Sequence, residues 1–410
     1  MAKVARTNSA FTLVGKIKLD TTSEDAKKQS FKIEQINEKG NWMSSTMNFG
    51  VDCGQECGTV YASLTGGHSL SFDSKRYIFK RDKDGNLITG ADGKYEQHEI
   101  SFSERESFDM SQLQSYDGFT LGLGVQGDNK TSTVKKYVFE EDFIKAVRDN
   151  IKDGDKVRVL GHLTYYRNPE DGTVTITKQI QSVYLSRVED EKFSATFNMS
   201  VLIDEHTVGQ PNAKDRVIPL FVKVCDYVGT VNKKKYNDNG CYAIKILYDY
   251  SHIKPEDKLA LKTLKTNLDV YFKAKPNEVN LLVIKGKFVE GTPVTEIRIE
   301  DYPQETQNLF SLGLVSKEEL EGIAATGNRT RDMYFTSFGI DKETVKIINE
   351  KGKYKASEII MAQDLPVIED KSVPTPTANN VEIPDLASDL DNNDDFEPDF
   401  INSLFGGEDN

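Results

Sequence analysis

The chain contains one local pattern twice, and this repetition constrains the fold more than any other feature. Apolar residues at helical spacing predict a helix over 139–151, and the strand-like stretch that follows it contains Gly161. A second predicted helix begins at Pro255 and is followed by a similar strand that contains Gly286. Short β-like runs bounded by Gly, Asn and Asp surround both helices. The sequence therefore predicts two copies of one mainly β module.

The two copies differ in length. The first opens at 11–17 and the second at 197–203, so these strands are about 185 residues apart, whereas Gly161 and Gly286 are about 125 residues apart. The first copy must therefore contain an insertion of about 60 residues. Residues 62–120, which are rich in Gly, Ser and Asp, are the expected place for it.

Several strands, one helix before the fourth strand, and a glycine that bends the strand after this helix are typical of a five-stranded, partly open barrel. This pattern resembles the oligonucleotide-binding (OB) fold, and the segment from Gly154 to Arg187 is similar to the last two strands of single-stranded-DNA-binding proteins. The predicted fold is mainly β: two OB-fold-like five-stranded barrels in tandem, the first with a large β-hairpin insertion, a small α-helical appendage and a disordered acidic tail. The expected domains are a first barrel at 8–190, with the insertion at about 62–120, and a second barrel at 191–303, with a β run at 295–300 near its end. A small helical region at 304–362 and the tail at 365–410 follow.

The acidic balance of the chain lies in its C-terminal end. The chain has a net charge of −13, and residues 365–410 hold twelve Asp or Glu and one Lys, which leaves −2 for the rest. Scattered acids, prolines and little periodicity are typical of disordered segments. Because the remaining body is nearly neutral, the overall acidity does not exclude binding to nucleic acid.

The tail also carries apolar residues near its end, namely Phe396, Phe400, Leu404 and Phe405. Their spacing would place them on one face of a helix formed on a partner. The tail is similar to the acidic, apolar-tipped tails of single-stranded-DNA-binding proteins, which recruit replication and repair enzymes and compete with DNA for the basic groove. It differs from the bacterial pattern because the chain ends in Glu408-Asp409-Asn410. A tail that serves only solubility is the alternative.

Binding of single strands without sequence preference requires aromatic faces beside Lys or Arg. Several β stretches supply both, although alternate residues of a strand face the core, so any one of these aromatic residues could equally pack inside. The candidates in copy one are Trp42, Tyr61, Lys80, Arg81, Tyr165, Tyr166 and Arg167, and those in copy two are Lys223, Tyr227, Lys233, Lys234, Lys235, Tyr236, Tyr242, Lys245 and Tyr248.

Few residues suggest a metal or a cofactor. Four cysteines are too few for a disulfide framework, so reduced thiols are expected. Cys53 and Cys57 are weak candidates for zinc, which Cys225 and Cys241 could complete, but their spacing is unlike that of paired zinc knuckles. The string Gly122–Gly127 matches a dinucleotide fingerprint without the required helix after it. We expect neither a cofactor nor a metal.

These features predict a non-enzymatic single-stranded-DNA-binding protein of replication, recombination or repair, and the combination resembles phage-encoded members of this class. Single-stranded DNA and tail-recruited proteins are the expected partners, with self-association possible. The alternatives are a β-rich assembly protein, for instance a virion component, and a metal-dependent nuclease. No segment in the sequence resembles a signal peptide or a membrane span, so we expect a cytoplasmic protein, in the host cytoplasm if phage-encoded.

Overall fold

The computed structural model describes residues 4–20, 29–82, 86–91, 93–113, 118–126, 131–231, 234–254, 256–291, 304–312, 330–339 and 349–367. Fourteen of the described strands form one continuous sheet, and β5 and β6 form a separate one. Within these ranges, no helix combines the length and the apolar character that a membrane crossing requires.

The first half of the chain folds into a closed barrel. Its elements are β1 (Ser9–Lys18), β3 (Trp42–Asp52), β4 (Thr59–Ser69), α1 (Glu140–Asn150), β9 (Lys156–Arg167) and β10 (Val174–Leu185). Strand β1 pairs with β3, β3 with β4, β4 with β10, β10 with β9, and β9 with β1, and only the pair of β4 and β10 is parallel. This is the strand order of an OB barrel, with α1 between the third and fourth strands.

The second half repeats this order. Its elements are β11 (Ser194–Ile203), β12 (Val217–Val231), β13 (Lys234–Asp249), α2 (Lys258–Phe272), β14 (Glu278–Gly291) and β15 (Thr330–Phe338). Strand β11 pairs with β12 and β14, β12 with β13, β14 with β15, and the pair of β13 and β15 is again the parallel one. The predicted mainly β fold with two tandem OB barrels is confirmed.

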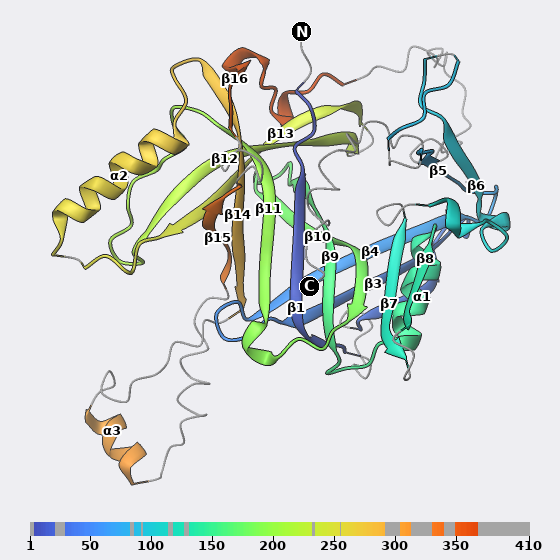
Figure 1. The fold of residues 1–410 in the computed structure, drawn as a ribbon, viewed down its shortest axis with the longest axis horizontal. Coiled ribbons are helices and arrows are strands. Elements are labelled where there is room, and N and C mark those ends of the chain that lie inside the picture. Colours follow the sequence, from blue (N-terminus) through green and yellow to red (C-terminus); the bar gives the residue numbers. More distant parts are fainter. Residues whose placement is uncertain are drawn as a thin grey trace, which may run out of the picture.

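The two barrels are joined by antiparallel pairing of their first strands, which lie side by side at the centre of Figure 1. Phe11 of β1 lies opposite Phe197 of β11. Each of these residues also lies opposite a glycine of its own barrel: Phe11 faces Gly161, and Phe197 faces Gly286. Phe11 and Phe197 are equivalent residues of the two repeats and face each other. The barrels are therefore related by an approximate twofold axis between these two phenylalanines.

Both glycines let a strand approach its neighbours closely. A Cβ atom on Gly286 would lie 2.1 Å from Cζ of Phe197 and 2.2 Å from the carbonyl oxygen of Tyr334. We expect Gly286→Ala to lower the free energy of unfolding by about 2 kcal/mol or more, because the added atom overpacks the junction of three strands. Urea unfolding measures this loss. Gly229→Ala is the control, since its Cβ would lie 3.4 Å from its nearest neighbour, and an equal loss in both variants would contradict the prediction.

The first barrel carries an additional strand and an insertion. The additional strand is β2 (Phe31–Ile36), which precedes β3. The insertion lies between β4 and α1 and contains the strands β5 (Lys75–Phe79), β6 (Gln97–Ser101), β7 (Phe119–Gln126) and β8 (Thr131–Tyr137) and the 3-10 helices η1 (Phe102–Glu104) and η2 (Met110–Gln112). The insertion therefore begins after Ser69, later than the predicted residue 62. Gly66 and Gly67 look like loop residues in the sequence, but they lie in β4, where Glu140 and Trp42 occupy the space that side chains would need.

Three consecutive carboxylates at the start of α1 connect it to the insertion and to β4. Glu140 forms an ion pair with Arg76 of β5 and Asp142 contacts Arg105 of the insertion at 2.7 Å, whereas Glu141 contacts His68 of β4 at 2.9 Å. Acidic residues in the first turn also complement the helix dipole. The sequence of α1 thus serves both the helix and the attachment of the inserted segment.

The prediction of a helical region over 304–362 is wrong for much of its length. Only α3 (Gln304–Ser311) is an α-helix among the described residues of this region, and 330–338 forms β15, the fifth strand of the second barrel. Strand β16 (Asn349–Lys355) pairs with β14, and the short 3-10 helices η5 (Ala356–Glu358) and η6 (Ala362–Asp364) follow it. Residues 295–300, the predicted final strand, lie outside the described residues. The barrel closes only after a long connection from β14, which the sequence pattern does not reveal.

Candidate nucleic-acid interface

The outer face of barrel one presents an aromatic ring beside a lysine. Lys18 of β1 pairs with Gly50 of β3, which pairs with Tyr61 of β4, so these three residues form one row across the sheet. A Cβ atom on Gly50 would lie 2.6 Å from Cγ2 of Thr59 and 3.4 Å from the Tyr61 ring, so Thr59 fills the space beside Gly50 and the Tyr61 ring lies next to it. The Tyr61 residue is 49% exposed and the Lys18 side chain is 55% exposed. Both are therefore accessible to a ligand.

Barrel two presents a similar row. Phe221 of β12 pairs directly with Lys245 of β13, and both are about half exposed. Phe221 occupies the position in barrel two that Gly50 occupies in barrel one. Lys16 of β1 faces Asp52, two residues after Gly50, and the equivalent Leu202 of β11 faces Lys223, two residues after Phe221. Barrel one thus carries its ring on β4 and its lysine on β1, and barrel two carries its ring on β12 and its lysine on β13.

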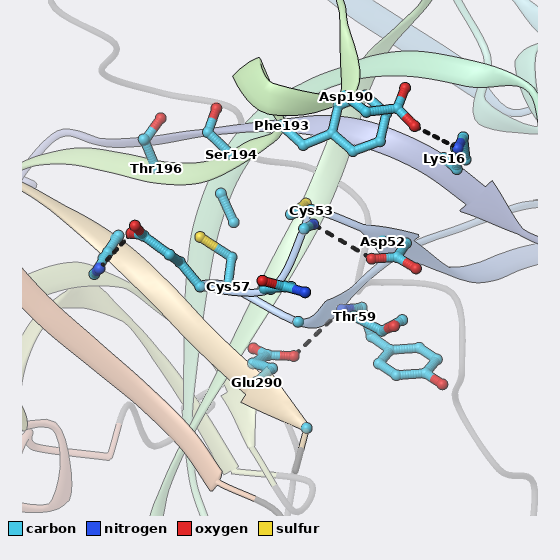
Figure 2. A pocket seen from close by; sticks show the side chains of 18 of the residues that line it. Lys16, Asp52, Cys53, Cys57, Thr59, Asp190, Phe193, Ser194, Thr196 and Glu290 are labelled. Carbon is cyan, nitrogen blue, oxygen red and sulfur yellow. Dashed lines mark hydrogen bonds and ion pairs between the residues drawn. The ribbon is translucent and has the colours of Figure 1, made fainter. Parts of the chain in front are cut away.

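A trough at the junction of the barrels begins at the Tyr61 row. It consists of two adjoining cavities of about 1100 and 940 Å³, which share Lys18, Tyr61, Glu290 and Arg331 in their linings. Figure 2 shows the larger one, in which the turn from Cys53 to Thr59 of barrel one faces Glu290 of β14. Asp332, which lines the smaller cavity, lies 4.0 Å from Nζ of Lys245. The trough therefore leads from the Tyr61 row towards the Phe221 row.

Several cations of the trough have carboxylate partners. Lys18 contacts Asp52 at 2.9 Å, and Lys287 contacts Glu56 at 2.9 Å. Asp190 accepts hydrogen bonds from both Lys156 and Lys16, which lower the pKa of its carboxyl group. Figure 2 shows the bond from Lys16. A phosphate that binds to one of these lysines must take the place of a carboxylate, so the exposed ion pairs moderate the affinity for anions.

A buried ion pair fixes the floor of the trough. Lys178 of β10 bonds to Glu290 of β14, and each side chain is less than a tenth exposed. The Lys178 ammonium group lies 4.5 Å from the ring centroid of Phe288, and the main-chain amide of Tyr61 donates to Glu290 at 3.3 Å. The backbone adds a bond from the amide of Glu290 to the carbonyl of Cys57 at 2.9 Å. These contacts hold the two barrels in one orientation.

The predicted stacking roles of Tyr165 and Tyr242 are wrong. Both side chains are buried, and their rings stack on each other with centroids 5.9 Å apart, across the junction of the barrels. Burial raises the pKa of Tyr242 to about 12 and also raises that of Tyr165. The hairpin of β9 and β10 packs against β13 here, so these rings bind the barrels together and cannot contact bases.

The other predicted residues have varied positions. Tyr248 packs on Phe335 with ring centroids 6.0 Å apart, and Lys223 forms an ion pair with Asp204. Lys80 and Arg81 follow β5, outside the main sheet, where Lys80 pairs with Glu96 at 3.1 Å. Exposed residues are Tyr61, Tyr166, Lys234, Lys235 and Lys245, and half-buried ones are Trp42, Lys80, Arg81, Arg167, Lys223, Tyr227, Tyr236 and Tyr248. Lys233, Phe396, Phe400, Leu404 and Phe405 lie outside the described residues.

The sequence predictions omitted three residues that the structure places at this surface: Lys18, Phe221 and Arg331. Phe221 had a detectable signal, because Ile218, Leu220, Val222 and Val224 alternate with it and are all buried. Strict alternation places Phe221 on the opposite, outer face. Arg331 had no comparable signal, since its strand was not predicted.

The cysteines offer little reactive chemistry. Cys225 and Cys241 lie opposite each other on β12 and β13 and form a disulfide, so the expectation of reduced thiols is wrong for this pair, and neither can complete a zinc site. Cys53 and Cys57 are free and buried, and burial raises the pKa of both thiols, which disfavours the thiolate that metals and electrophiles require. The described residues contain no group of three or more His, Cys, Asp or Glu that could hold a metal.

Stability should depend on pH through His162 of β9. Burial, together with the nearby Arg6 guanidinium, lowers the pKa of His162 to about 4 from 6.5. The unfolded chain therefore takes up this proton first, and the stability present above pH 6.5 is lost as the pH falls towards 4. We expect the free energy of unfolding to fall by roughly 2 kcal/mol between pH 7 and pH 5. Urea unfolding of the native chain and of His162→Gln measures this, and an equal fall in both would exclude His162 as the cause.

Comparisons with known proteins give similar solved structures but no family. No family model matches the chain, and no curated protein matches it. The wild-type single-stranded DNA binding protein from Thermus aquaticus is 8% identical with a TM-score of 0.27, over 70% of this chain and 87% of that chain. A deletion mutant of the same protein that also carries a point substitution is 8% identical with a TM-score of 0.29, over 70% of this chain and 89% of that chain.

Proposed function

We propose that this chain is a non-enzymatic single-stranded-DNA-binding protein that protects and organises single strands during replication, recombination or repair. The main support is the pair of aromatic and lysine rows on the outer faces of two OB barrels, with a trough at the junction of the barrels. Bases would stack on Tyr61 and Phe221, and Lys18, Lys245 and Arg331 would neutralise phosphates. Nothing in this mechanism requires a bond to be made or broken.

Electrophoretic mobility shifts with oligo-dT at two salt concentrations test the proposal. Each lysine or arginine that binds a phosphate releases counterions, so the affinity should fall steeply as the salt concentration rises. Duplex DNA of the same length should bind more weakly, because paired bases cannot reach the rings. Equal or tighter binding to the duplex would overturn the proposal, and degradation of the oligonucleotide would point to a nuclease.

The ion pair of Lys18 and Asp52 predicts a substitution that strengthens DNA binding. Asp52→Asn should strengthen binding to oligo-dT several-fold, up to about fivefold, because an exposed ion pair of this kind contributes about 0.2 to 1 kcal/mol. The substitution frees the Lys18 ammonium group for a phosphate. Titration at low salt measures the change, and Glu189→Gln, which alters an exposed carboxylate that pairs with Lys192, is the control. Weaker binding by Asp52→Asn would contradict the role of Lys18.

The acidic tail is proposed to recruit partner proteins through Phe396, Phe400, Leu404 and Phe405, in the cytoplasm where single strands arise. Its support is the sequence, which combines a net charge of −11 over 365–410 with regularly spaced apolar residues. Removal of the tail should leave binding to oligo-dT intact or stronger, since it removes negative charge that repels phosphates. Weaker binding by the shortened chain would contradict this expectation.

A further inference from the structure

Helix α2 exposes apolar side chains on the side that faces away from its barrel. Leu259 is 76% exposed and Val270 is 65% exposed. Leu259 and Val270 are three helical turns apart, so they lie on the same side, about 16 Å from each other. The opposite side packs on the core through Leu268 and Phe272. A helix that only covered its barrel would have a polar outer side.

The corresponding helix of the first barrel is covered. The Phe143 ring of α1 stacks on Phe119 of β7 with centroids 5.4 Å apart and contacts Tyr137 of β8. Further along α1, Lys145 forms an ion pair with Glu34 of β2 at 2.5 Å. Within the described residues, nothing comparable covers Leu259 or Val270 in the second barrel, where α2 lies at the left edge of Figure 1. The internal repeat thus has one covered and one uncovered helix.

The surroundings of the uncovered side are basic. Residues 254–275 contain six Lys and three acidic residues, Glu256, Asp257 and Asp269. Asp257 caps the helix by accepting from the amide of Ala260 at 2.8 Å, and Asp269 pairs with Lys273 at 2.9 Å. Lys258 and Lys262 are exposed beside Leu259. The occupant that suits this surface is an acidic segment with regularly spaced apolar side chains.

The C-terminal tail of the chain has this composition. Phe396, Phe400 and Leu404 recur every four residues, which gives one apolar stripe in a helix, among five acidic residues over 391–400. The 28 residues that separate Val367 from Phe396 can extend to about 90 Å, so the tail can reach any part of the surface of a globular protein of this size. We propose that the tail docks on the outer side of α2 in its own chain, with its apolar stripe over Leu259 and Val270. This inference does not depend on DNA binding.

Photo-crosslinking in the full chain tests this contact. Phe396 is replaced by p-benzoylphenylalanine, the protein is irradiated, and mass spectrometry identifies the attached peptides. We expect cross-links to 254–275 within one chain, at a yield that does not change with protein concentration. Lys258→Glu combined with Lys262→Glu should lower this yield at least fivefold. The matched control, Lys152→Glu with Lys192→Glu, changes two exposed lysines of the first half and should leave it unchanged.

Each other outcome contradicts the proposal. Cross-links to β3, β4, β12 or β13 would place the tail on the proposed DNA-binding face, and cross-links between chains would make a second copy the occupant. No cross-link above background, or equal yields in both lysine pairs, would show that α2 does not hold the tail. Hydrogen exchange provides an independent measurement. Replacement of Phe396, Phe400 and Leu404 by Ala should speed exchange of the α2 amides at least threefold, and circular dichroism confirms that the variants are folded.

Discussion

Replacement of Lys178 by Met is expected to lower the free energy of unfolding by about 3 to 5 kcal/mol. The substitution leaves the Glu290 carboxylate buried between the barrels without its cation. An unpaired buried charge is costly because burial removes it from water and no opposite charge compensates for the lost hydration. Urea unfolding, followed by circular dichroism, measures the loss.

The double variant Lys178→Met with Glu290→Met separates the cost of an orphaned charge from the loss of the pair itself. It should recover most of the lost stability, because well-packed apolar residues often replace a buried ion pair without loss. Lys287→Met is the surface control, since Lys287 pairs with the exposed Glu56, and should cost less than about 1 kcal/mol. A double variant as unstable as the single one would show that Lys178 contributes through packing and not through charge.

The combined variant Tyr61→Ala with Phe221→Ala should weaken binding to oligo-dT by about 30-fold or more. Base stacking on an aromatic ring contributes about 1 to 3 kcal/mol per base, and this variant removes one ring from each barrel. Both rings are half exposed, so their removal leaves no cavity in the core and should preserve the fold. Fluorescence titration with oligo-dT measures the affinity.

Phe72→Ala is the matched control because Phe72 is equally exposed, at 50%, but follows β4 and lies outside both rows. It should bind oligo-dT like the native chain. If Phe72→Ala weakened binding as much as the combined variant, or if the combined variant bound normally, the two rows could not be the binding surface. Separate measurements on Tyr61→Ala and Phe221→Ala show which ring contributes more to binding.

The repeat made the barrels predictable from sequence. Gly161 and Gly286 mark equivalent strands because both must pass close to a phenylalanine and a neighbouring backbone, which is a local requirement with a local signature. The fifth strand of the second barrel lacked such a signature. Its pairing with β14 and β13 depends on contacts across a long connection, and no spacing rule in the sequence specifies those contacts.

Candidate binding residues were harder to predict because composition does not tell which face of a strand a side chain occupies. Tyr165 follows Val157, Val159 and Leu163 on the inner face of β9, so alternation places it inside, whereas Tyr166 is exposed. The disulfide had no such local signal. Cys225 and Cys241 meet only because the long hairpin of β12 and β13 has one particular register.

The facing phenylalanines of β1 and β11 make this polypeptide equivalent to a dimer whose halves can never dissociate. A dimer of separate subunits falls apart on dilution, whereas covalently linked halves keep a fixed effective concentration. Each half can also acquire its own changes. The first half carries the insertion between β4 and α1, and the second carries the long hairpin of β12 and β13. Gene duplication followed by such divergence would convert a symmetric pair into a molecule with two distinguishable ends.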